Sequence, residues 1–185
     1  MKTWHVWPVA VGFRTALYRV RQFVSALLAH VSPEDLREAD ELLPPPAQEL
    51  FRRMGMPDQQ HALNVMRALR RDGSAGPDLL AAALLHDVAK SAAQIRPWHR
   101  AVIVLSKRFA PRVLEWLTAG EPGGWRRPFA VHARHAAMGA EWAAQAGCSS
   151  MTVSLIRRHQ EPLHHAPLTE EERLLIALQR ADGVN

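Results

Sequence analysis

The stretch from Leu79 to Ser91, LLAAALLHDVAKS, decides the fold. Its Ala/Leu run is apolar enough for a helix that is buried on most sides, yet it ends in His86, Asp87 and Lys90. A buried imidazole or carboxylate without a partner is costly, because it loses its hydration and gains nothing in return. We therefore expect other parts of the chain to supply partners for these side chains.

The composition is typical of one globular domain. The chain has 185 residues, of which 48% are hydrophobic and 22% are charged, and this length allows a substantial core. The single cysteine, Cys148, excludes an internal disulfide framework, so we expect a cytoplasmic protein. No apolar run approaches the roughly 20 residues that span a bilayer, and we expect no membrane partner.

The formal net charge of +5 indicates an affinity for something anionic. The basic residues are spread along the chain rather than gathered in one stripe. A solvated Arg-rich surface, or a small molecule that carries phosphate, therefore accounts for the charge better than a nucleic acid does.

Helical signals recur from end to end, and no segment alternates for long with the period of a strand. We predict an all-α fold, a single helical bundle of about eight to ten helices. Prolines and small polar residues mark the helix starts, and glycines mark the ends. The expected helices begin near Pro8, after Ser32, after the triple proline, after Pro57, at Pro77, Pro97, Pro111 and Pro128, near Met151, and after Thr169.

The triple proline at 44–46 is a rigid break in the chain. We predict an N-terminal helical extension over residues 1–55 and a main domain over residues 56–185. The amphipathic N-terminal helices also offer a surface through which two copies can form a homodimer.

Five of the expected helices carry an imidazole or a carboxylate on or beside their apolar face. In the helix from Pro77, Lys90 follows His86 at i+4 and Asp87 at i+3, so all three gather on one side. Any one such histidine is more often an ordinary core residue. Four imidazoles and two carboxylates together are typical of a metal-ligand set, since a cation is the partner that each lacks. The set is His61, His86, Asp87, His135, His159 and Asp182.

Imidazole nitrogen and carboxylate oxygen without thiolate favour Fe, Mn, Co, Ni or Zn over Mg or Ca. Six side chains exceed the needs of one open ion, so a pair of divalent transition-metal ions bridged by Asp87 is reasonable, although the sequence leaves one or two ions open. Two such ions can activate a water molecule and stabilise a phosphoryl displacement.

The order of these residues resembles the HD superfamily of metal-dependent phosphohydrolases. His61 in HALNVMRAL, His86 and Asp87 in LLHDVAK, and Asp182 in RADG fill the family pattern H…HD…D. The segments HAAMGAEWAAQAG and LIRRH are similar to those that supply two further histidines in the bacterial symmetrical dinucleoside-tetraphosphate hydrolases. One departure is Gln160, where those hydrolases usually have Thr.

The resemblance implies an HD-type fold in which the six residues bind metal. It also places Lys90 near the substrate phosphate, and we expect Asp87 and Lys90 to be catalytic. His132, one turn before His135, is the alternative ligand and otherwise contacts substrate. Of the two arginines before His159, we take Arg158 as the one that reaches a phosphate.

The expected activity is hydrolysis of a phosphoester or phosphoanhydride of a nucleotide or dinucleoside polyphosphate by metal-activated water. The expected partner is thus a phosphorylated, nucleotide-like small molecule. One alternative is a non-catalytic HD module that binds a phosphorylated ligand or scaffolds a partner. Another is a purely structural bundle with histidines in its core.

Overall fold

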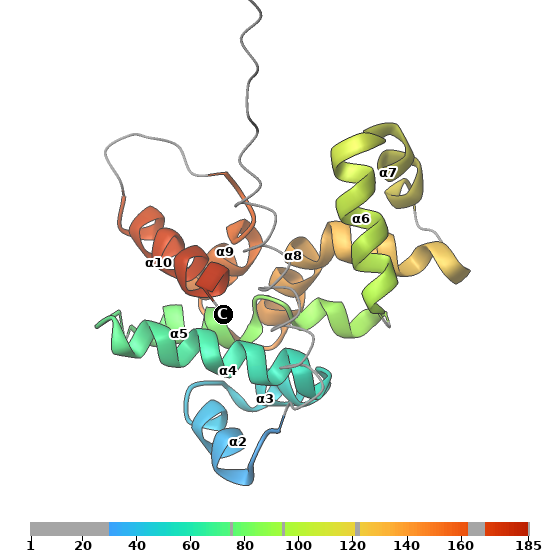
Figure 1. Cartoon of the computed structure of the whole chain (residues 1–185). Helices are drawn as coiled ribbons and strands as arrows, with labels where there is room; N and C mark the ends of the chain where they lie inside the picture. The colour runs from blue at the N-terminus through green and yellow to red at the C-terminus, as the bar shows by residue number, and fades with distance from the viewer. Residues whose placement is uncertain (1–29, 75, 94, 121–122, 163–168, 185) are drawn as a thin grey trace, which may run out of the picture.

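The computed structural model describes residues 30–74, 76–93, 95–120, 123–162 and 169–184. These residues form nine α-helices and two short 3-10 helices, with no strand among them, which confirms the predicted all-α fold (Figure 1). The helix expected near Pro8 lies outside the described residues. The elements are α2 (Pro33–Asp40), α3 (Pro45–Arg52), α4 (Met56–Arg71), α5 (Pro77–Leu85), η1 (Val88–Ala92), α6 (Pro97–Phe109), α7 (Pro111–Thr118), η2 (Gly124–Arg126), α8 (Arg127–Gln145), α9 (Ser150–Arg158) and α10 (Glu170–Val184).

The helix boundaries follow the local signals in the sequence. Ser32 accepts a hydrogen bond from the Asp35 amide while the Asp35 carboxylate accepts one from the Ser32 amide, which closes a capping box at the start of α2. Gly73 and Gly147, with φ of +77° and +82°, follow the ends of α4 and α8 in a conformation that side chains rarely adopt.

Helix α5 is the centre of the bundle. Every residue from Leu79 to Leu85 is buried, and the helix packs between α4 and α9. Figure 1 shows α4 and α5 side by side, with α9 and α10 above them. A helix surrounded in this way has no solvent-facing side after its first turn, which is why its seven last residues are all Leu or Ala.

The described part of the N-terminal extension packs onto the main domain. Side chains of α2, α3 and the turns after them, including Phe51 and Met54, belong to the same hydrophobic core as α4 and α5. Arg67 of α4 also pairs with Asp35 and Glu38 of α2. The proposed division after residue 55 stays a prediction.

The chain leaves the α-helical path at the HD pair. His86 is the last residue with helical dihedrals, Asp87 has φ −105° and ψ 5°, and the chain continues as η1. The sequence pattern predicted one unbroken helix through Lys90. Successive residues of an α-helix point about 100° apart, so the break is what allows both His86 and Asp87 to face the interior.

Helices α6 and α7 with η2 form an arm that stands apart from the bundle and joins it through α8 (Figure 1). The arm has a small core of its own, made of Ile103, Leu117 and Phe129. Within the described residues, no helix combines the length and the apolarity needed to cross a bilayer.

Gly139 allows α8 to lie close to the HD turn. A methyl group at this position would sit 3.4 Å from side-chain carbons of Val88 in η1 and of Ile156 in α9, and 3.8 Å from Ala89. Alanine therefore just fits, whereas a larger side chain must push α8 away from both neighbours.

We predict that Gly139→Val lowers the free energy of unfolding by about 1–3 kcal/mol, because overpacking separates α8 from η1. Gly139→Ala is the control, and it should be neutral or stabilising by up to about 1 kcal/mol through its higher helix propensity. Urea unfolding followed by circular dichroism measures both. Equal stability of the valine and alanine variants would show that this close approach does not limit the packing.

Candidate metal centre

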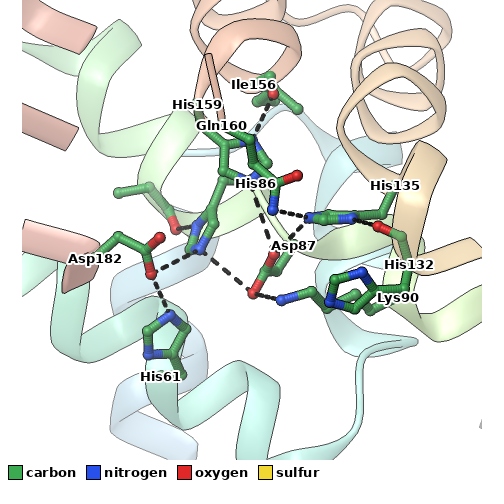
Figure 2. A network of polar contacts seen from close by, with 11 residues as sticks. His61, His86, Asp87, Lys90, His132, His135, Ile156, His159, Gln160 and Asp182 are labelled. Atoms are coloured by element: carbon green, nitrogen blue, oxygen red, sulfur yellow. Dashed lines mark hydrogen bonds and ion pairs between the residues drawn. The ribbon is translucent and has the colours of Figure 1, made fainter. Parts of the chain in front are cut away.

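Five helices bring the six expected ligands to one place (Figure 2). Each ligand lies either within a helix or at one of its ends. His61 lies in α4, His86 ends α5, Asp87 precedes η1, His135 lies in α8, His159 ends α9, and Asp182 lies in α10. The convergence that the sequence pattern predicted is thus present in the structure.

The six residues form two groups of three, each able to hold a metal ion. In each group one ligand atom per residue lies within 4.8 Å of the others. Ligand atoms bound to one ion at about 2.1 Å lie roughly 3–4 Å apart, so small side-chain shifts suffice. The outer group is His61, His86 and Asp182, and the inner group is Asp87, His135 and His159.

The outer group is the side of the centre that reaches solvent. Oδ1 of Asp182 lies 2.9 Å from Nε2 of His61 and 3.6 Å from Nε2 of His86. The side chains of His61 and Asp182 are 24% and 37% exposed, whereas His86 is fully buried. His61 and Asp182 are therefore the ligands of this group that solvent reaches.

Asp87 lies between the two groups and offers one oxygen to each side. Its Oδ1 is 3.3 Å from Nε2 of His135 and 3.9 Å from Nε2 of His159 in the inner group. Its Oδ2 is 3.5 Å from Nε2 of His86 in the outer group and 2.5 Å from Nζ of Lys90. This division of the two oxygens is the geometry that a bridging carboxylate requires.

Three of the four histidines are oriented by the same backbone contact. In His86, His135 and His159 the Nδ1 atom is within hydrogen-bonding distance of the carbonyl three residues earlier. The acceptors are the carbonyl oxygens of Ala83, His132 and Ile156, at 2.9, 2.6 and 2.7 Å respectively. A carbonyl can only accept, so Nδ1 carries the proton, and in the neutral ring Nε2 presents its lone pair to the centre. This is the outer-shell arrangement that histidine ligands of metals use.

The centre holds negative charge that calls for a cation. Burial opposes ionisation of Asp87, but the positive charges of His86 and Lys90 outweigh it and hold the pKa of Asp87 well below its usual value. Burial likewise opposes a charge on His86, yet the carboxylates of Asp87 and Asp182 raise the pKa of His86. Nε2 of His86 is fully buried and has no hydrogen-bond partner. A metal ion supplies both the charge and the missing partner.

His159 and Asp182 are in protonation states that suit ligation at neutral pH. Burial, together with the positive charge of His86, lowers the pKa of His159 to about 4, so its ring is neutral. Burial favours protonation of Asp182, but the hydrogen bond from His61 and the positive charge of His86 prevail and lower its pKa. Asp182 is therefore an ionised carboxylate.

The structure also locates the three residues expected to act on substrate. Lys90 lies beside Asp87 with its side chain 18% exposed, at the edge of the centre. His132 contributes its carbonyl to His135, and the ring centroids of these two histidines lie 5.7 Å apart. His135, rather than His132, belongs to the metal-ligand group.

Arg158 is engaged elsewhere. Its guanidinium pairs with Glu161 at 2.9 Å and with Glu171 of α10 at 2.6 Å. The hydrogen bonds that Arg158 donates to these two carboxylates raise its pKa. The structure thus gives Arg158 a role in joining α9 to α10, and its contact with substrate stays a prediction.

Gln160 is a residue of the centre whose role the sequence did not reveal. Its Nε2 lies 3.2 Å from Nε2 of His135. Because Nδ1 of His135 carries the ring proton, the amide of Gln160 donates to the lone pair that faces the centre. The departure from Thr at this position was the one available signal.

Buried histidine and aspartate groups of this cluster can therefore bind a metal ion. Comparisons of the chain with protein-family models, with curated proteins and with solved structures found no match. The resemblance to HD phosphohydrolases consequently rests on the motif residues, and the structure adds that these residues lie together.

We predict that the purified protein binds divalent transition metal and loses it in a His86→Ala variant. The matched control is His30→Ala, since His30 is an exposed histidine of α2's N-terminal flank. Metal at about 100 times its Kd stabilises the fold by about 2.7 kcal/mol, so a chelator should lower Tm by roughly 5–10 °C. Elemental analysis and thermal unfolding measure these effects. An unchanged Tm with chelator would point to a structural cluster of histidines.

We further predict that His61→Ala lowers the metal content from two ions per chain to one. His61 belongs only to the outer group, and the three inner ligands are unchanged by the substitution. His135→Ala is the matched variant for the inner group. Titration calorimetry with a divalent ion gives the stoichiometry. Loss of all metal in His61→Ala would show that the six residues hold a single ion.

Proposed function

We propose that this chain is a metal-dependent phosphohydrolase of the HD type, which cleaves a phosphoester or phosphoanhydride of a nucleotide-like substrate. The observation that carries the proposal is the position of Asp87, with one oxygen toward each of two ligand groups and a lysine ammonium beside it. Paired ligand groups that share a carboxylate are the arrangement that phosphoryl displacement uses.

The donor set favours Fe, Mn, Co, Ni or Zn as the bound metal. Bound at this centre, a pair of such ions supplies an activated water and neutralises charge on the phosphate oxygens. The four imidazoles and two carboxylates hold the ions, and the Nδ1 hydrogen bonds fix the rings so that little reorganisation is needed.

Lys90 has two roles in this proposal. Its ammonium balances the Oδ2 atom of Asp87, and its partly exposed position places a positive charge where a phosphate arrives. His132 of α8, whose ring centroid lies 5.7 Å from that of His135, is a second side chain that substrate can contact. In this proposal substrate enters at the partly exposed outer group, and the burial of the inner group keeps bulk water out of the centre.

A purely structural bundle explains the centre less well. A structural bundle would leave the buried Nε2 atom of His86 without a hydrogen-bond partner. It would also leave the charge of Asp87 balanced only by the protonated side chains of His86 and Lys90. A non-catalytic module would bind metal and ligand equally well, so turnover separates it from an enzyme. A cytoplasmic location is part of the same proposal, since nucleotide-like substrates are found there.

The test is an assay of metal-loaded protein against nucleoside mono-, di- and triphosphates and dinucleoside polyphosphates. We expect turnover that disappears in Asp87→Ala. Lys90→Met should retain metal and lose roughly 10- to 1,000-fold in kcat/KM, since it removes one electrostatic contact to the reacting phosphate. Lys107→Met, in the exposed part of α6, is the matched control and should keep full activity.

Two results would contradict the proposal. Ligand binding without hydrolysis across Mn, Fe, Co, Ni and Zn would favour the non-catalytic module. Full activity in Lys90→Met would show that the lysine balances Asp87 alone and does not act on substrate.

A further inference from the structure

The arm formed by α6, α7 and η2 carries nearly all the exposed apolar side chains of the described residues. Eight large hydrophobic side chains are more than two-fifths exposed, and seven of them lie between residues 98 and 125. Phe109, at the end of α6, is the most exposed, at 74%. The seven are Trp98, Val104, Leu105, Phe109, Val113, Trp116 and Trp125, which we call the arm surface, and the eighth is Met56.

Helix α6 is apolar on two sides. Its inner side buries Ile103 and Ser106 against the rest of the arm. Its outer side presents Val104, Leu105 and, one turn later, Phe109 to solvent. One side is enough to attach a helix to its domain, so the second apolar side indicates a partner that covers it.

The aromatic members of the arm surface are linked through one buried ring. The ring centroids of Trp98 and Trp125 lie 6.1 and 6.2 Å from that of Phe129, and Trp116 lies 6.0 Å from Trp125. Each of the three tryptophans is half exposed or more. The arm therefore displays a connected set of tryptophan rings next to the aliphatic side chains.

The same segment carries an excess of positive charge. Residues 96–134 contain eight Lys or Arg and two Asp or Glu, a formal charge of +6, whereas the other residues contain fifteen and sixteen, a charge of −1. Some of these cations already lie over exposed rings, with Arg126 4.5 Å from the Trp116 centroid and Arg108 5.3 Å from that of Phe109. The basic residues that the sequence analysis treated as spread along the chain are thus in excess in this segment and in residues 1–29, which contain four Lys or Arg and no Asp or Glu.

We propose that the arm surface binds the face of an anionic lipid bilayer. Aliphatic and phenyl side chains enter the acyl boundary, tryptophan rings lie at the depth of the headgroups, and Lys and Arg contact lipid phosphates. This attachment needs no spanning helix. It replaces the expectation of no membrane partner, and it is independent of the proposed hydrolase activity.

Other partners match the arm surface less well. Two copies that meet through this face would bring two segments of charge +6 together, which opposes a symmetric dimer. A nucleic acid would satisfy the arginines and tryptophans, but Val104, Leu105 and Val113 have no hydrogen-bonding group for bases or phosphates. An anionic bilayer is the partner that accommodates both the charge and the aliphatic side chains.

The test is co-sedimentation of the full chain with vesicles of phosphatidylcholine, with or without phosphatidylglycerol. We expect binding to the anionic vesicles that weakens as salt is raised. Leu105→Ser with Phe109→Ser should reduce partition about tenfold or more, since both side chains are inserted. Lys107→Glu with Arg108→Glu should remove the preference for anionic vesicles.

The matched controls are Met56→Ser and Arg71→Glu, which change an exposed hydrophobic and an exposed basic residue outside the arm. Both should bind vesicles as the unchanged chain does. All substituted side chains are exposed, so circular dichroism and Tm should stay constant. As a measurement on the unchanged fold, acyl-brominated phosphatidylglycerol should quench tryptophan fluorescence, and less so in Trp116→Phe with Trp125→Phe.

Several results would overturn the proposal. They are absence of vesicle binding, equal binding to neutral and anionic vesicles, and an equal loss in the Met56→Ser control. A concentration-dependent dimer that Phe109→Ser abolishes would assign the face to a second copy. Tighter binding to an oligonucleotide duplex, with vesicles displaced, would assign it to a nucleic acid. Vesicle binding requires neither metal nor substrate, so failure of the hydrolase assay leaves this test unaffected.

Discussion

The ionised carboxylate of Asp87 is the constraint on which the arrangement of helices depends. The residue is nearly inaccessible to solvent, yet its pKa stays well below the usual value because positive groups surround it. Removing a carboxylate from water costs several kcal/mol even after relaxation, so positively charged or hydrogen-bonding groups must lie beside it. Contacts to Asp87 come from His86, Lys90, His135 and His159. The balance of one charge thus fixes α5, η1, α8 and α9 relative to one another.

The ends of two helices serve this balance directly. The last carbonyls of a helix lack intrahelical partners, and in α5 and α9 a carbonyl of the last turn accepts from the histidine that follows the helix. The contact satisfies Ala83 or Ile156 and at the same time turns the Nε2 atom of His86 or His159 toward Asp87. One hydrogen bond therefore both completes a helix terminus and orients a ligand. This dual role requires that α5 and α9 end at the centre.

Much of this arrangement is predictable from the sequence, for local reasons. Proline at the first helical position and Ser or Thr at the N-cap act within one turn, so the starts of α2, α5 and α10 could be predicted from neighbouring residues alone. The inward side of each ligand-bearing helix followed from its apolar stripe. The six expected ligands are therefore the six that converge.

Features that depend on how helices meet were not predictable in this way. The change from α5 to η1 occurs at Asp87 although the local sequence continues a good helix, and the histidines that face Asp87 from α8 and α9 are far along the chain. The contact of Gln160 with His135 and the pairing of Arg158 with Glu171 join elements through space. The exposed side of α6 was hidden because apolar residues lie on both of its faces, and periodicity alone does not tell which face a domain covers.

Helix α8 connects the two surfaces of interest while keeping their residues separate. Its first turns supply Phe129 to the arm, its middle supplies His135 to the centre, and Gly139 lies against the HD turn two turns before the helix ends. The helix is continuous over this length, so it fixes the position of the arm relative to the centre. The cations of the arm act at the solvent surface, where counter-ions screen them within about 10 Å. Metal ligation depends on residues of the buried centre. Substitutions on the outer side of α6 should therefore change binding to the bilayer and leave the geometry of the metal ligands unchanged.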